Sequence, residues 1–157
     1  MVHSKALAIQ SEARDLGFDL FFKESEDVYF QLVDDEELRV STEKLFIDKH
    51  YSSAIEEAFK CLNNIVKKKT NSSLDGSDLM HNVFSPKKPL LKLNKLKTDT
   101  DKNEQQGYME ITAGVMTGIR NPRAHQHNYK DEIETALELL GLANHLIKKV
   151  KKASKIR

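Results

Sequence analysis

The sequence predicts an all-α fold, a helical bundle with a short N-terminal extension, and three observations lead to that fold class. Apolar residues recur at helical spacing in two long segments, residues 50–69 and 131–152. Only three of the 157 residues are proline, so few positions interrupt a helix. Hydrophobic residues make up 39% and charged residues 31%, which suits one compact helical domain plus an appendage and argues against wholesale disorder.

Residues 1–40 differ in pattern from the remainder and form the predicted N-terminal extension. Apolar residues between positions 6 and 16 predict a short helix that stops near Gly17. Residues 28–33 are a β-prone run, which we interpret as a short strand or hairpin arm. The acidic residues 34–37 then predict a turn or a boundary. We therefore divide the chain into an extension, 1–40, and a helical domain, 41–157.

The helical domain begins with a short helix that Ser41 or Thr42 caps and that runs to about Asp48. A long amphipathic helix follows over residues 50–69. Its predicted buried face consists of Ile55, Ala58, Phe59, Leu62 and Val66.

A short helix is then predicted from about Asp75, and Pro86 stops it. The linker to about residue 100 is anchored by leucines. A third major helix covers about 102–120 and the last covers 131–152. The short helix presents Leu79, Met80, Val83 and Phe84, the linker carries Leu90, Leu91, Leu93 and Leu96, and the last helix buries Ile133, Ala136, Leu137, Leu140, Ala143, Ile147 and Val150.

Two glycines, Gly114 and Gly118, lie one turn apart on the third predicted helix. Each costs about 1 kcal/mol in helix propensity relative to alanine. A repeated cost of this kind indicates that something approaches the backbone closely. The candidates are a neighbouring helix, or else a partner subunit or substrate.

The net charge of +1 hides an uneven distribution, with acids at residues 24–37 and lysines at 67–69, 87–97 and 148–155. These lysines either complement helix dipoles and solvate the surface, or they form a phosphate-tracking surface for nucleic acid. The single cysteine, Cys61, favours a reducing compartment. No apolar run reaches the roughly 18 residues of a membrane span, and residues 1–4 lack a signal-peptide core. We expect a cytoplasmic protein without a membrane partner.

The candidate functional residues begin with Arg120, Asn121 and His125. On a straight helix, Arg120 and His125 would point about 140° apart. Pro122 disfavours helical dihedrals at Asn121 and lacks an amide hydrogen. We therefore expect the helix to end or kink near Asn121, which would bring the two side chains to one side.

These residue types suit cleavage of a phosphodiester in RNA. Arg120 is a permanently charged fork of donors that matches phosphate oxygens. Histidine is the side chain best suited to proton transfer at cellular pH, so His125 can take or give a proton. The substrate's own 2′-hydroxyl can serve as nucleophile, so the chemistry requires no metal or cofactor. Asn121 can orient the histidine or the phosphate. The alternative is that Arg120 caps helix carbonyls and His125 is an ordinary turn residue.

Four neighbouring residues are candidates for substrate binding. Arg123 is either a second phosphate contact or surface charge. His127 and Asn128 contact substrate or lie in an exposed loop. Tyr129 stacks on a base or packs at the start of the last helix. His50, His81 and His145 are scattered without metal-ligand spacing, so we predict no metal site.

The segment from Arg120 to His125 resembles the Arg-x4–6-His motif of the HEPN superfamily, and the polar Asn121 after the arginine is typical of its nuclease members. A wider pattern resembles the small prokaryotic Ymh family within that superfamily, over about residues 41–150. It comprises Asp75-Gly76, Leu79-Met80, Phe84-Ser85, Pro89-Leu90, Gln106-Gly107 and Gly114 ahead of the motif.

This resemblance implies a HEPN-like helical domain and a homodimer in which two motifs face each other. It also implies metal-independent RNA cleavage that leaves a 2′,3′-cyclic phosphate, with Arg120 and His125 catalytic and Asn121 supporting. Such proteins often act as toxins or in phage defence, so an antitoxin or regulatory protein is an expected partner. The alternative is a non-catalytic HEPN module that binds RNA, nucleotide or protein.

Overall fold

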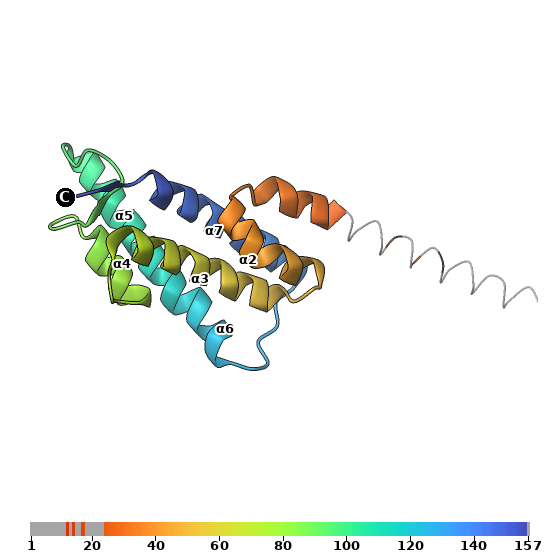
Figure 1. Cartoon of the computed structure of the whole chain (residues 1–157). Helices are drawn as coiled ribbons and strands as arrows, with labels where there is room; N and C mark the ends of the chain where they lie inside the picture. Colours follow the sequence, from red (N-terminus) through yellow and green to blue (C-terminus); the bar gives the residue numbers. More distant parts are fainter. Residues whose placement is uncertain (1–11, 13, 15–16, 18–23, 157) are drawn as a thin grey trace, which may run out of the picture.

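The structure is a computed structural model that describes residues 12, 14, 17 and 24–156 (Figure 1). It confirms the all-α helical bundle. Residues 24–32 are also helical. The labelled elements are α2 (Glu36–Ile47), α3 (Tyr51–Thr70), α4 (Gly76–Phe84), β1 (Leu91–Lys92), α5 (Asp99–Val115), the π-helical turn η1 (Met116–Arg120), α6 (Asn121–His125), α7 (Ile133–Lys152) and β2 (Ser154–Lys155).

Helix α3 is the centre of the bundle. It packs against α2 and α7 and also contacts α4, η1 and α6 (Figure 1). The bounds predicted for this helix are confirmed to within one residue, and its five predicted core residues are fully buried. The predicted face of α7 is buried as well, apart from Leu137, which is half-buried. Helical periodicity was therefore a sufficient guide to the two longest helices.

The strand predicted over residues 28–33 is wrong, because residues 24–32 are helical. Ser25, Tyr29 and Val33 follow one another at four-residue spacing, and all three are buried. The ring of Tyr29 stacks on Phe46 with centroids 4.6 Å apart, and its hydroxyl lies 2.9 Å from the Thr42 hydroxyl. This burial on one helical face outweighs the local β propensity of the run. The helix predicted over residues 6–16 falls outside the described residues, apart from positions 12 and 14.

Helix α2 begins at Glu36, earlier than predicted, so the boundary placed after residue 40 falls within this helix. Asp35 is its N-cap, and its side chain accepts a hydrogen bond from the Leu38 amide at 3.1 Å. The buried Asn144 of α7 fixes this start, because its Oδ1 accepts from the amides of Asp34 and Asp35 at 3.2 and 3.0 Å. The acidic residues predicted to form a turn are therefore a helix start held by α7.

The linker between α4 and α5 is anchored by the fully buried Gln105. Its amide donates to the carbonyls of Phe84 and Leu91, and its oxygen accepts from the Leu93 amide, all at about 3 Å. Leu91 is buried as predicted, and Leu90 and Leu93 are partly buried. Strand β1 pairs antiparallel with β2, which ties the linker to the C-terminal end of α7.

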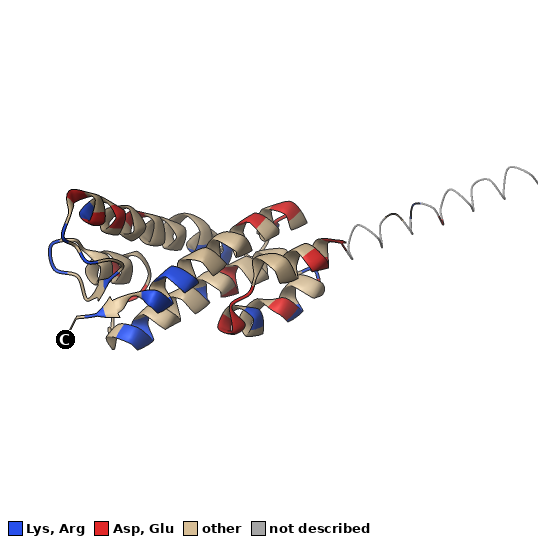
Figure 2. Cartoon of the chain, turned by 90° about the horizontal axis from the view of Figure 1, so that it is seen from above, with Lys and Arg blue, Asp and Glu red and all other residues tan. Residues whose placement is uncertain are grey.

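Basic residues gather in the C-terminal part of α7 (Figure 2), and several of its lysines form ion pairs with acidic residues from other elements. Lys148 pairs with Asp34 at 2.7 Å, and Lys151 pairs with Asp35 at 2.7 Å and Glu37 at 2.8 Å. These contacts join α7 to the start of α2, so part of the predicted phosphate-tracking charge is neutralised within the chain. Across the described residues, none of the helices is long and apolar enough to cross a bilayer.

Candidate functional site

The chain stays helical through Asn121, so the expected end of the helix there is wrong, and the irregularity near Asn121 is the π-helical turn η1. Asn121 has helical dihedrals, φ −60° and ψ −44°, and its amide donates to the Met116 carbonyl, five residues back. The change of register occurs one turn earlier, in η1. Pro122 then lies in the first turn of α6, directly after η1. The wider π-turn accommodates the proline that a regular α-helix interior would not.

The side chain of Arg120 is held by two neighbours and is 17% exposed. Both terminal nitrogens lie 3.3 Å from Oδ2 of Asp75, and Nε donates to Oδ1 of Asn121 at 3.3 Å. The contact with Asp75 joins η1 to the start of α4. In this structure Asn121 therefore orients Arg120, and it does not orient His125.

Asp75 belongs to a polar cluster that the sequence did not reveal. Asn63 of α3 is 3% exposed, donates to Oδ1 of Asp75 at 2.8 Å and accepts from the Gly76 amide at 2.9 Å. Lys67 lies 3.5 Å from the same carboxylate. Burial acts to raise the pKa of Asp75, but the hydrogen bonds from Asn63 and Arg120 and the nearby positive charges outweigh it, so the pKa lies below its usual value.

Gly76 adopts φ +59°, in the left-handed region. A Cβ at this position would lie 3.6 Å from Nη2 of Arg120, an ordinary contact. The positive φ, and not a lack of space, is therefore what favours glycine here. The Asp75-Gly76 pair thus forms the turn that presents a carboxylate to Arg120.

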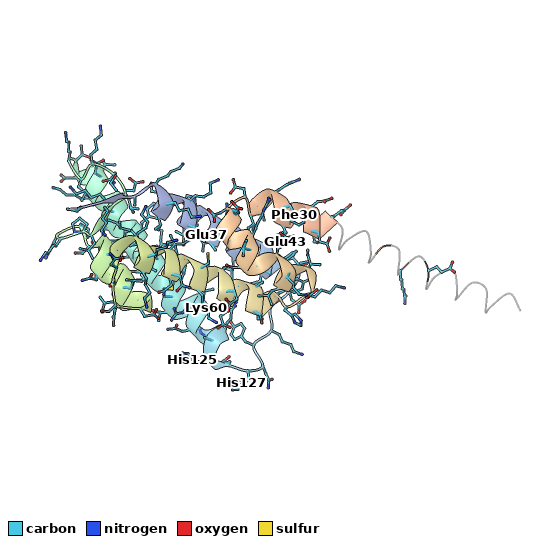
Figure 3. The ribbon with its side chains drawn as sticks, in the orientation of Figure 1. Phe30, Glu37, Glu43, Lys60, His125 and His127 are labelled. Carbon is cyan, nitrogen blue, oxygen red and sulfur yellow. The ribbon has the colours of Figure 1, made fainter. Side chains whose placement is uncertain are left out.

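His125 is the last residue of α6, and its side chain is exposed. Figure 3 shows it where α6 meets the loop to α7, with His127 further along that loop. Among the described residues, the His125 ring has no hydrogen-bond or ion-pair partner, and no hydrogen bond joins it to Arg120. The backbone stays helical between Arg120 and His125. It therefore does not bring the side chains of Arg120 and His125 within one chain to the same side, as the sequence had led us to expect.

Arg123 is buried and has a structural role that the prediction of a phosphate contact or surface charge did not anticipate. Its side chain is 5% exposed and that of Asp131 is 6% exposed. Nε and Nη2 donate to the two oxygens of Asp131 at 2.8 and 2.6 Å, and Nη1 donates to the Ile119 carbonyl at 2.8 Å. All three nitrogens of its guanidinium therefore donate within the chain, which leaves few N–H donors for a phosphate. The pair closes the loop between α6 and α7.

The other predicted substrate contacts lie in that loop. His127 and Asn128 are exposed. The guanidinium carbon of Arg123 lies 4.6 Å from the centre of the Tyr129 ring. One face of the Tyr129 ring is thus covered by Arg123 of α6, which leaves less of the ring for a base.

One face of α5 and η1 is not covered by any helix of the described residues. A Cβ added at Gly107, Gly114 or Gly118 would have no atom of the described chain within 4 Å, outside the local helix backbone. Ile111 lies four residues after Gly107 and three before Gly114, and Gly118 follows four residues later. Ile111 is 45% exposed. Within the described residues, a neighbouring helix therefore does not account for these glycines, and the other expected explanation is a partner subunit or a substrate.

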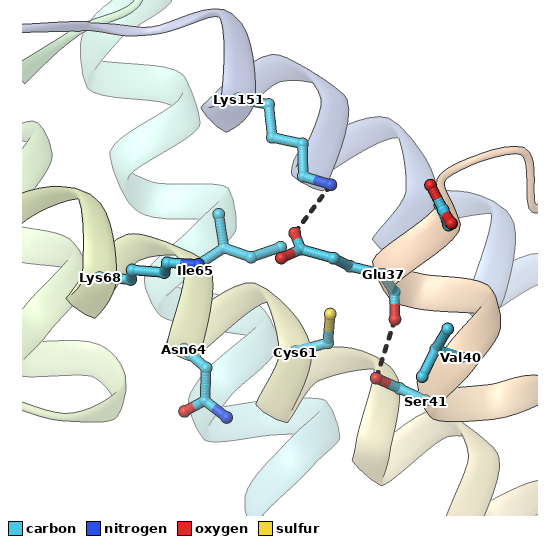
Figure 4. Close-up of a pocket in the computed structure, with 9 residues that line it drawn as sticks. Glu37, Val40, Ser41, Cys61, Asn64, Ile65, Lys68 and Lys151 are labelled. Carbon is cyan, nitrogen blue, oxygen red and sulfur yellow. Dashed lines mark hydrogen bonds and ion pairs between the residues drawn. The ribbon is translucent and has the colours of Figure 1, made fainter.

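A hollow of about 480 Å³ lies between α2, α3 and α7 and is lined by Val40, Cys61 and Ile65, among others (Figure 4). Glu37 and Lys151 form an ion pair across it at 2.8 Å. Burial raises the pKa of the Cys61 thiol, which disfavours a reactive thiolate. None of the motif residues lines this hollow, so it is not part of the candidate site.

The fold and the site together define the class of protein. It is an all-α bundle in which the π-helical turn η1 carries an arginine and the following helix α6 carries an exposed histidine five residues later. Comparison with known families is more specific, because residues 34–150 match the family Hypoth_ymh, described as a protein of unknown function. The chain belongs to this family. The comparisons with curated proteins and with solved structures gave no match.

Proposed function

We propose that the protein is a dimeric endoribonuclease of HEPN type that cleaves RNA without a metal ion. The observation that carries the proposal is the exposure and orientation of the side chains of Arg120 and His125. His125 is an exposed imidazole without a partner among the described residues, and Arg120 is a partly exposed, oriented guanidinium on the same helical segment. Arg123, the other cation of the motif, is used to hold the segment in place.

The proposed reaction is an attack of a 2′-hydroxyl on the adjacent phosphorus. The new O2′–P bond forms and the P–O5′ bond breaks, which leaves a 2′,3′-cyclic phosphate and a 5′-hydroxyl. One imidazole takes the proton of the 2′-hydroxyl and another donates a proton to the departing 5′-oxygen. The guanidinium of Arg120 stabilises the charge that builds on the phosphate oxygens.

A second copy of the chain supplies what one chain lacks. The uncovered face of α5 and η1, with Gly107, Gly114 and Gly118, allows the backbone of a partner helix to approach closely. Arg120 lies two residues after Gly118, and His125 follows five residues later. A twofold interface there would bring two arginines and two histidines to one cleft. The same chemistry suits an effector in defence or a toxin that a regulatory protein restrains.

The alternative is a non-catalytic module that binds RNA, nucleotide or a protein. One observation favours it: within the chain, Arg120 is directed to Asp75 and not to His125. In this account the Asp75 contact would be a structural ion pair, and the segment would serve only as a binding surface.

The experiment that tests the proposal is incubation of total tRNA and of a mixed-sequence RNA with the full chain in EDTA, with analysis of the new ends. We expect cleavage with 2′,3′-cyclic phosphate and 5′-hydroxyl ends. Binding of RNA without cleavage, by protein that is folded and dimeric, would support the alternative.

A further inference from the structure

The orientation of the Arg120 fork has a definite chemical consequence. A guanidinium has five N–H donors. Nε is directed to Asn121, and the two terminal nitrogens share one carboxylate oxygen of Asp75. Each terminal nitrogen therefore keeps one further N–H for a ligand. The Asp75 contacts, at 3.3 Å, are long for hydrogen bonds, so they orient the fork without saturating it.

Asp75 is itself fixed from the interior of the bundle. Its other carboxylate oxygen accepts from the buried amide of Asn63 at 2.8 Å, and the same amide holds the next residue, Gly76, through its backbone nitrogen at 2.9 Å. Lys67 approaches the same oxygen at 3.5 Å. The position of Arg120 is thus set, through Asp75, by a residue of the central helix α3.

We propose that Asp75 is a positioning residue that orients Arg120 toward a phosphate of RNA, and that Asn63 acts through it. This inference rests on the proposed ribonuclease function. Asp75 does not bind the substrate, because a carboxylate repels phosphate. It orders a side chain that would otherwise sample many rotamers, and such ordering matters most in the transition state.

If Asp75 positions Arg120, removal of its charge should give a different result than if Asp75 only supports the fold. Loss of the Asp75 charge removes a repulsion from bound phosphate, so RNA binds more tightly. The same change releases the Arg120 fork, so the cleavage step slows. A carboxylate that only stabilises the fold would, on removal, lower thermal stability and reduce both properties together.

The test compares Asp75→Asn with Asp78→Asn in the full chain. Asp78 lies in the first turn of the same helix and is exposed, so its substitution changes the same charge without a contact to Arg120. Affinity is measured with an RNA oligonucleotide that carries 2′-deoxy sugars and cannot be cleaved. The rate is measured at saturating enzyme, and the order of Arg120 is measured from its Nε–Hε NMR signal.

For Asp75→Asn we expect about two- to fivefold tighter RNA binding at low salt. We expect the cleavage rate to fall by roughly 10- to 100-fold and the Arg120 Nε–Hε signal to broaden or move to the position of a free arginine. Asp78→Asn should keep the wild-type rate and the wild-type Arg120 signal. Asp75→Glu should recover part of the rate, because it restores the charge with altered reach.

An unchanged rate together with an unchanged Arg120 signal in Asp75→Asn would overturn the inference. So would parallel losses of affinity, rate and melting temperature, which would indicate a structural residue. If the wild-type protein cleaves no RNA, the proposed function fails by itself. The Arg120 signal and the affinity for the uncleavable oligonucleotide then decide whether Asp75 positions the arginine.

Discussion

The buried ion pair between Arg123 and Asp131 makes the stability of the α6–α7 loop directly testable. Both side chains are at least 94% buried, and Arg123 makes three hydrogen bonds there. Asp131→Ala leaves the guanidinium buried with only the Ile119 carbonyl and the Tyr129 ring. Removal of one partner of a buried pair costs about 3–5 kcal/mol. We expect the free energy of unfolding to fall by about 3 kcal/mol, because those two remaining contacts offset part of the loss.

The assay is urea denaturation followed by far-UV circular dichroism, with thermal melting as a second readout. For a chain of this size, a loss of 3 kcal/mol lowers Tm by about 6–12 °C. The matched control is Asp99→Ala, which breaks the exposed ion pair with Lys102 and should change stability by at most about 0.5 kcal/mol. The double variant Arg123→Met with Asp131→Leu should recover much of the loss, because it buries no unpaired charge. A change below about 1 kcal/mol in Asp131→Ala would refute this reasoning.

Three further predictions concern the uncovered face, the Asp75 cluster and the start of α2. Gly114→Ala should stabilise the chain by about 0.5–1 kcal/mol in urea titrations, whereas Gly114→Glu should shift a dimer toward monomer in analytical ultracentrifugation. The pKa of Asp75 is lower in the folded chain, so its contribution to stability is present above the usual aspartate pKa and is lost as the pH falls through the folded value; Asp75→Asn should flatten the pH dependence of Tm below about pH 4. Asn144→Leu leaves the amides of Asp34 and Asp35 without an acceptor and should cost about 1–3 kcal/mol in urea denaturation, with an unchanged stability contradicting its role.

The sequence was informative wherever one helical face repeats. The buried residues of α3 and α7 follow a 3.6-residue period over 20 residues each, so tertiary burial and local pattern agree. Residues 28–33 gave the wrong prediction because aromatic and branched side chains favour strands locally. The burial of Tyr29 against Phe46 depends on a helix packing that no local pattern encodes.

The residues of the candidate site were predictable from the sequence, but the contacts that they make were not. Arg120 and His125 stand out because their types and spacing suit one chemistry. The partners of the arginines, Asp75 and Asp131, lie 45 and 8 residues away and are fixed by tertiary contacts. The π-turn of η1 was missed because Pro122 forbids a regular helix interior without specifying which alternative the chain adopts.

The measurement that tests the central claim most directly compares RNA cleavage by four proteins in EDTA: wild type, Arg120→Ala, His125→Ala and the control His81→Ala. His81 is an exposed histidine on α4, outside the motif. We predict that wild type and His81→Ala cleave RNA to 2′,3′-cyclic phosphate ends, whereas the other two remain folded and bind RNA without cleaving it. Equal cleavage by all four proteins, or none by a folded and dimeric wild type, would contradict the account.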